Sequence, residues 1–172
     1  IDMATAENDT ATKVELWKKL TFDIKRTRDS NGTCVQASQQ LATHSFREGA
    51  FDDGVKALAT TYNAAQMPSH VVAYVRTPLS ELIGQEASKA KALKLADQAI
   101  AWLKTASPAD QSTPEAKTIA RQVLFGIADL TALAQRDDQV PAAYDAIVKA
   151  FNTDDEALSR LAAWYKSKMN YE

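Results

Sequence analysis

Three side chains could carry nucleophilic or acid–base chemistry, namely Cys34, His44 and His70. A cysteine nucleophile needs a histidine base within hydrogen-bond reach. His44 follows Cys34 by ten residues on the same expected helix, roughly 15 Å further along its axis, so these two side chains cannot meet. His70 could reach Cys34 only through the tertiary fold. A buried structural cysteine is therefore favoured, and an enzyme using one of these three residues requires that it lie in a cleft beside another polar group.

The spacing of potential metal ligands is equally sparse. With two histidines, the chain contains no His-x-x-His, His-Glu-x-x-His or Glu-x-x-His pattern, and one cysteine excludes an internal disulfide or a cysteine cluster. His44 and Glu48 lie four residues apart and could supply two ligands, but a solvated pair on a helix surface is favoured. Glycine-rich phosphate loops and nucleophile elbows are absent from the sequence. We therefore predict no catalytic site, no metal and no cofactor.

The most informative segment for binding is an expected helix over residues 114–136. Its main apolar stripe contains Ala116, Ile119, Val123, Ile127, Leu130 and Ala134. Arg121, Phe125 and Asp129 follow one another at four-residue spacing on the opposite face. One interpretation, the favoured one, is a central helix buried on nearly all sides, with Arg121 and Asp129 paired near its edge. The other is an exposed Phe125 flanked by opposite charges, which is typical of a hot spot for a protein partner.

A second candidate surface lies on an expected long helix over residues 78–105. Leu95 and Trp102 lie seven residues apart, on the face opposite the main apolar side of that helix. Since tryptophan is costly to leave in water, this face is expected to meet another helix or another molecule. Such aromatic residues could also line a pocket for an apolar small molecule between helices.

Caps and apolar periodicity predict the elements that must position these residues. The chain has five glycines and five prolines, and no stretch alternates convincingly as a strand. The seven expected helices begin near Val14, Thr33, Asp52, Pro78, Pro114, Pro141 and Thr153. The fold class is therefore all-α, either an antiparallel helical bundle or a short stack of helical hairpins.

One segment has a local resemblance to a known repeat. Residues 49–58 read Gly-Ala-Phe-Asp-Asp-Gly-Val-Lys-Ala-Leu. They resemble the turn and second-helix start of a tetratricopeptide repeat, where a glycine, an aromatic residue and a small residue let two helices pack closely. No 34-residue period links this segment to the rest of the chain. The resemblance therefore implies an antiparallel helical hairpin and not a repeat array.

Composition limits the remaining classes. The chain has 172 residues, 45% of them hydrophobic, and a formal net charge of −2. The near-balance of charge removes the electrostatic case for nucleic acid, and no apolar run is long enough for a membrane span. We expect a disordered segment over residues 1–11 and a single helical domain over 12–172. The polar start of the chain favours a secreted or periplasmic protein over a cytoplasmic one.

These observations together favour a non-catalytic helical protein that acts through protein–protein interaction, an exported accessory or effector. Its candidate partner-binding residues are Phe125, Arg121, Asp129, Trp102 and Leu95. One alternative is a small carrier that holds an apolar ligand between helices. The other is an enzyme with an unrecognised site. The sequence does not define an oligomeric state.

Overall fold

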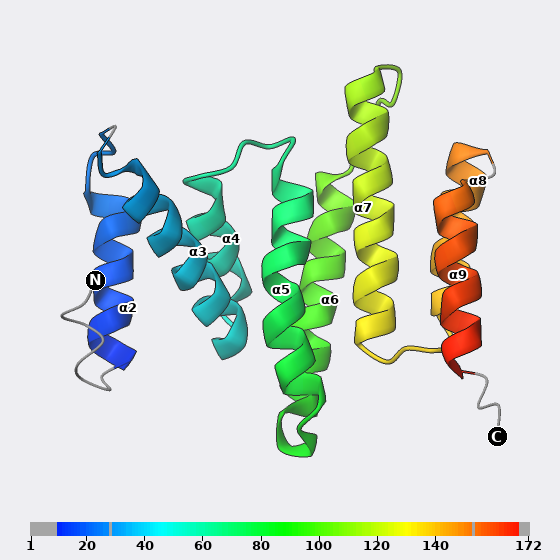
Figure 1. Cartoon of the computed structure of the whole chain (residues 1–172), viewed down its shortest axis with the longest axis horizontal. Coiled ribbons are helices and arrows are strands. Elements are labelled where there is room, and N and C mark those ends of the chain that lie inside the picture. The colour runs from blue at the N-terminus through cyan, green and yellow to red at the C-terminus, as the bar shows by residue number, and fades with distance from the viewer. Residues whose placement is uncertain (1–9, 28, 153, 169–172) are drawn as a thin grey trace.

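The chain folds as a row of antiparallel helices (Figure 1). The structure is a computed structural model that describes residues 10–27, 29–152 and 154–168. In this part of the chain there are eight α-helices and no strand, which confirms the all-α prediction. The α-helices are α2 (Thr10–Lys18), α3 (Asn31–Glu48), α4 (Phe51–Ala59), α5 (Met67–Ile83), α6 (Lys89–Ala106), α7 (Pro114–Leu133), α8 (Val140–Phe151) and α9 (Asp155–Lys168). A π-helical turn, Lys19–Asp23, continues α2, and a 3-10 turn, Glu86–Ser88, precedes α6.

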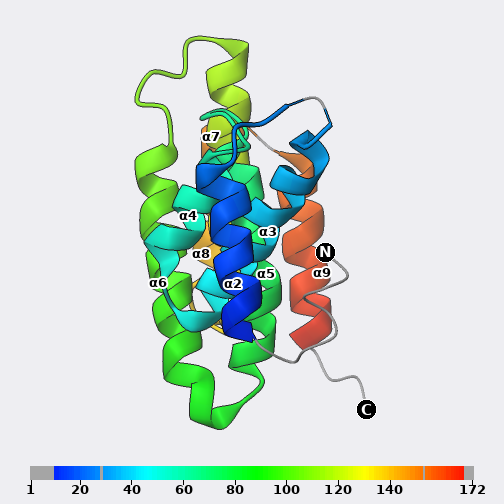
Figure 2. The same cartoon turned by 90° about the vertical axis from the view of Figure 1, so that its left-hand side faces the viewer.

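Three helical hairpins form the body of the molecule: α3 with α4, α5 with α6, and α7 with α8. Within this row α3 packs on α5 and α5 packs on α7, while α2 covers α3 at one end and α9 covers α8 at the other. Viewed from the end that carries α2, helices α4 and α6 lie on one side and α3, α5 and α9 on the other (Figure 2). The arrangement is a short stack of hairpins.

The first hairpin is tight because of two glycines. Gly49 ends α3 in the left-handed region, with φ of 81°, a conformation that favours glycine. Gly54 lies directly under the ring of Phe46, where a Cβ atom would collide with that ring. Phe51 is buried between them. The antiparallel hairpin expected from the tetratricopeptide-like segment is therefore confirmed.

The prediction of one long helix over residues 78–105 is wrong. The helix α5 begins at Met67, with Pro68 in its first turn, and Pro78 lies inside it. The chain then turns at Gly84 and resumes as α6. Pro78 lacks the N–H that would bond to the fourth preceding carbonyl, yet the helix continues through it because its apolar face is fully packed.

Two clusters of buried side chains hold the stack together. The larger one is built from α3, α4, α5, α6 and one side of α7. The smaller one lies between α7, α8 and α9 and contains Phe125, Ala128, Val140, Tyr144, Ile147 and Ala157. Helix α7 is thus shared, which explains why its sequence is apolar on more than one face.

The ends of the chain differ from expectation in one detail. Residues 1–9 of the expected disordered segment lie outside the described residues, but Thr10 and Ala11 form the first turn of α2. Thr153, expected to cap the last helix, also lies outside them. Among the described residues, Asp154 caps α9, since its Oδ1 accepts a hydrogen bond from the backbone N–H of Ala157 at 3.1 Å. None of the described helices combines the length and apolar character required to cross a membrane.

Candidate functional site

Helix α7 presents the three residues that the sequence places on its second face. Its start is fixed by Thr113, whose Oγ1 accepts a hydrogen bond from the N–H of Ala116 at 3.1 Å, and by Pro114 in the first turn. From there Arg121, Phe125 and Asp129 follow on successive turns, on the side of α7 that faces α8 and α9.

Phe125 lies beneath two guanidinium groups and is only 7% exposed. The Cζ atom of Arg121 is 4.5 Å from the centre of its ring, and that of Arg160, from α9, is 4.8 Å away. Both distances permit cation–π contact. The interpretation of Phe125 as an exposed hot spot is therefore wrong, and the buried interpretation describes its position.

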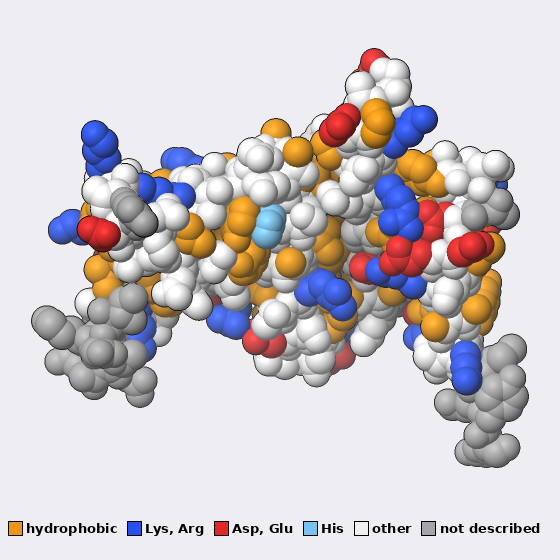
Figure 3. Space-filling view, turned by 45° about the horizontal axis from the view of Figure 1, so that its top comes forward, with side chains coloured by type: hydrophobic (Ala, Val, Ile, Leu, Met, Phe, Trp, Pro, Cys, Tyr) orange, Lys and Arg blue, Asp and Glu red, His pale blue; other side chains and the backbone are white. Residues whose placement is uncertain are grey.

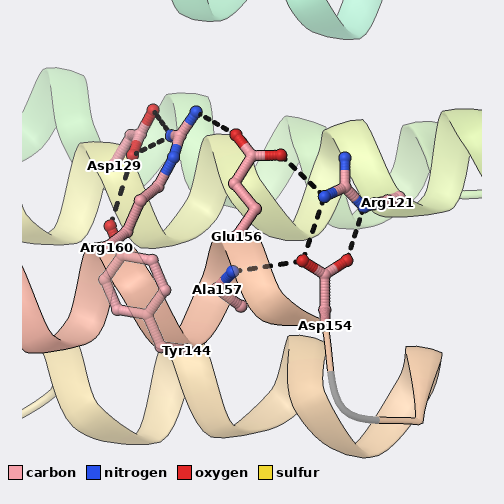
Figure 4. A network of polar contacts seen from close by, with 7 residues as sticks. All are labelled: Arg121, Asp129, Tyr144, Asp154, Glu156, Ala157 and Arg160. Carbon is pink, nitrogen blue, oxygen red and sulfur yellow. Dashed lines mark hydrogen bonds and ion pairs between the residues drawn. The ribbon is translucent and has the colours of Figure 1, made fainter.

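Arg121 is held by two carboxylates near the start of α9 (Figure 4). Its Nε donates to Oδ2 of Asp154 at 2.6 Å, and its Nη2 donates to Oδ1 at 3.0 Å, a two-pronged pair. The same Nη2 donates to Oε2 of Glu156 at 2.7 Å. These hydrogen bonds from Arg121 lower the pKa of Asp154, and together with those from Arg160 they lower the pKa of Glu156. Both carboxylates are thereby kept ionised.

Asp129 is bound by Arg160 rather than by Arg121, so the expected pairing of Arg121 with Asp129 is wrong. Arg160 Nη1 donates to Asp129 Oδ1 and Oδ2 at 3.1 and 3.2 Å, while Nη2 donates to Glu156 Oε1 at 2.7 Å. Tyr144 of α8 donates from its hydroxyl to Asp129 at 3.5 Å, and burial, with the nearby Asp129 charge, raises its pKa. Glu156 joins the two arginines, so one continuous polar network links α7, α8 and α9.

This network borders a groove of about 230 Å³ between α5, α7 and α9. Ser69 and Val72 of α5 form one wall, and Glu156 and Arg160 of α9 form the other. The floor comes from α7 and consists of Arg121, Gln122, Phe125, Gly126 and Asp129. The space-filling view shows basic and acidic side chains gathered together where α7 and α9 lie (Figure 3). The groove therefore combines an apolar strip with charged groups of both signs.

The other two candidates lie elsewhere, on α6. Leu95 is fully buried in the larger cluster, and its side chain offers no surface to a partner. Trp102 is half-buried against the same cluster. Neither residue lines the groove, because the second face of α6 packs within the stack.

The candidates for catalysis do not converge. Cys34 is completely buried. His70 stacks on Tyr62, with ring centres 3.5 Å apart, and burial lowers its pKa. His44 does lie in a groove, of about 380 Å³, beside Glu48 and other polar groups of α2, α3 and α4, as the enzyme alternative requires.

Within that groove, however, the His44 side chain forms no hydrogen bond or ion pair with another described residue. Its nearest aromatic neighbour is Trp17, with ring centres 6.3 Å apart. Across residues 10–27, 29–152 and 154–168, no three histidine, cysteine or acidic side chains are grouped so that they could hold a metal ion. His44 is therefore a half-buried imidazole beside an aromatic ring, with no described polar partner that would orient it.

Sequence reasoning missed Gly126, Asp154, Glu156 and Arg160 as parts of the groove and its network. The signal was a charge pattern. Glu156 and Arg160 are four residues apart and lie on one face of α9. At that spacing they can also form ion pairs with an arginine and an aspartate that lie two turns apart on a facing helix.

Comparison with protein-family models, curated proteins and solved structures finds no significant match to the chain.

Proposed function

We propose that this chain is a non-catalytic binding protein whose partner site is the groove between α5, α7 and α9. The observation that carries the proposal is the groove itself, where two partly exposed arginines, Arg121 and Arg160, lie over the buried ring of Phe125. Arginine is enriched among the residues that dominate protein–protein binding energy. The groove is preformed, because the network holds both arginines in place without a ligand.

The partner is a protein segment with mixed chemistry. Arg121, Arg160 and Glu156 keep between 37% and 46% of their side-chain surface exposed, so they remain available for additional hydrogen bonds. Val72 and Gly126 provide the apolar strip beside them. A segment that inserts one apolar side chain and places polar groups on both sides of it complements this surface.

An apolar-ligand carrier is less well supported. The grooves around Phe125 and His44 are both bordered by charged side chains, whereas a carrier needs a largely apolar cavity.

Site-specific photocrosslinking tests the proposed site. A photoreactive amino acid placed at Gln122, an exposed residue in the groove, should capture one defined partner from cells that make the protein. The same amino acid at Ala146, exposed on α8 and not part of the groove, should not capture it.

The captured protein is then purified and its affinity measured with groove-blocking variants. Ser69→Trp fills the groove from α5, and we expect it to weaken binding by about tenfold or more. Ser80→Trp makes the same change at an exposed position of the same helix outside the groove, and affinity should be unchanged. Equal affinity of the two variants contradicts the proposed site.

A further inference from the structure

Helix α9 carries an apolar stripe that no part of the stack covers. Leu158 and Tyr165 are 43% and 46% exposed, and the exposed Ala162 lies between them. At roughly 100° per residue these three side chains share one face of the helix. Their directions differ by about 60° or less, one sixth of a turn, and together they form a strip at four- and three-residue spacing.

The direction of this stripe follows from the other faces of α9. Ala157, Leu161 and Trp164 pack in the smaller cluster, while Glu156 and Arg160 face α7. The stripe lies about 100° from the packed face, on the side away from Arg160. It therefore points outward at the end of the row formed by α9, where a further helix would pack.

This end of the molecule differs from the other end. Four large apolar side chains in the described part of the chain are exposed, and two of them, Phe22 and Ile24, lie near α2. The ring of Phe22 is partly covered by Lys56, whose Nζ is 5.3 Å from the ring centre. Among the described residues, no Lys or Arg side chain lies over the Tyr165 ring in this way.

The charges along α9 indicate what covers the stripe. The first turn is acidic, with Asp155 and Glu156, and the last turn is basic, with Lys166 and Lys168. Glu156 and Lys168 are used within the chain, by the arginines and by Asp137 respectively. Asp155 and Lys166 form no ion pair with any other described residue, and both lie on the same flank of the stripe.

We propose that two copies of this chain associate through antiparallel packing of α9 against α9. With the two-fold axis between Leu161 and Ala162, Leu158 of each copy meets Tyr165 of the other, because both are equally far from the axis. The small side chain of Ala162 lies at the centre and lets the helices approach closely. Asp155 of each copy then lies beside Lys166 of the other. A two-fold interface requires such self-complementarity.

This association goes beyond the proposed partner binding and does not depend on it. The groove uses Glu156 and Arg160 on one side of α9, and the stripe lies on the opposite side. Both surfaces can therefore be occupied at once, and a failure of one proposal does not affect the other.

Sedimentation equilibrium with a matched pair of variants tests the proposal. The unmodified chain should show a species of twice the 18.8 kDa chain mass. Ala162→Glu should abolish it, whereas Ala163→Glu, the same change at the adjacent exposed alanine outside the stripe, should leave it intact. Circular dichroism checks that both variants keep their helix content. A monomer at every concentration, or equal behaviour of the two variants, overturns the proposal.

Charge reversal and crosslinking test the antiparallel orientation. Asp155→Lys should weaken association about tenfold, and adding Lys166→Asp should restore it, since the reversed pairs again attract. Ala162→Cys should form an intermolecular disulfide under air and Ala163→Cys should not, with the native Cys34 fully buried and unable to compete. Antiparallel pairing is contradicted if the double variant does not regain association and Ala162→Cys forms no intermolecular disulfide. That result would indicate that another molecule covers the stripe.

Discussion

Helix α7 contacts α5, α6, α8 and α9, and its contacts with α5 and with α9 are opposite in kind. Towards α5 its Gly126 lies against the side chain of Val72, so the two backbones approach closely through an apolar contact whose edge borders the groove. Towards α9 the two helices share few close backbone contacts, and the space between them is bridged by Arg121, Arg160 and their carboxylates. The first interface is fixed by shape and the second by charge.

The difference teaches how one helix can serve both as core and as site. Close packing of small against large side chains leaves no room for a ligand within the contact itself, and it gives the stack its rigidity. A polar bridge keeps the helices apart and leaves a groove between them, while its hydrogen bonds satisfy the charges that border it. We therefore expect different responses when each side of α7 is altered.

The largest expected effect comes from removing the ring that lies between the two interfaces. Phe125→Ala should lower the free energy of unfolding by about 3–5 kcal/mol, because the ring is buried and both arginines lose their contact with it. Phe22→Ala, at a 43% exposed ring, should cost less than about 1 kcal/mol. Urea unfolding measures both, and similar losses would show that Phe125 does not belong to the core.

The close contact between α5 and α7 should respond strongly to a single added methyl group. In Gly126→Ala the new Cβ would lie 2.6 Å from Cγ2 of Val72 and 3.3 Å from Cδ1 of Leu103, so overpacking should cost about 1–3 kcal/mol. Gly32→Ala makes the same change near the start of α3, where nothing lies within 4 Å of the added atom. There we expect a gain of about 0.4–1 kcal/mol in thermal or urea unfolding. A neutral Gly126→Ala would mean that α5 and α7 are not in close contact.

Substitutions at the polar interface between α7 and α9 should lower stability less. They should also distinguish the contribution of the ion pair from that of the helix cap. Asp154→Ala removes both the partner of Arg121 and the cap of α9, and a lost cap costs about 1 kcal/mol. Asp154→Asn keeps a good cap and loses only the charge, so its effect should be smaller. Urea unfolding of the two variants side by side provides the comparison. An equal loss in both would show that the ion pair, and not the cap, holds the start of α9.

The smallest effect concerns pH. The pKa values of Asp154 and Glu156 are lowered from their ordinary 3.8 and 4.5 by hydrogen bonds from Arg121, so the folded state favours their ionised forms. Their contribution to stability is present above these ordinary values and is lost as the pH falls through the lowered, folded-state values. Arg121→Gln removes the main cause, and its unfolding free energy should decline less steeply below pH 4.5 than that of the unmodified chain. Parallel pH profiles would argue against the network.

The helical hairpins were predictable because their signals are local. Gly49 at the end of α3 and Pro114 at the start of α7 act within one turn of their own position. The long helix over residues 78–105 was a wrong prediction for the same reason. A proline preceded by threonine is typical of a helix start, and only the packing around Pro78 shows that it lies inside α5.

The groove could be predicted only in part. The spacing of Arg121, Phe125 and Asp129 places them on one face of α7, and that follows from the helix period alone. What covers this face depends on Asp154 and Arg160, which are 33 and 31 residues away from their partners in sequence. The close approach at Gly126 also involves a residue of α5, and periodicity does not identify such distant neighbours.

Native-state hydrogen exchange tests the central claim most directly. The claim is that α5 and α6, on one side of α7, are held by close packing, whereas α9, on the other side, is held to α7 by charged side chains. The Ala162→Glu variant should be used, so that self-association does not protect α9. We predict that the amides of α9 exchange at least about tenfold faster than those of α5 and α6 at neutral pH, and that added salt widens the gap. Equal protection of α9 and α5, with all amides exchanging through a single global opening, would contradict this account.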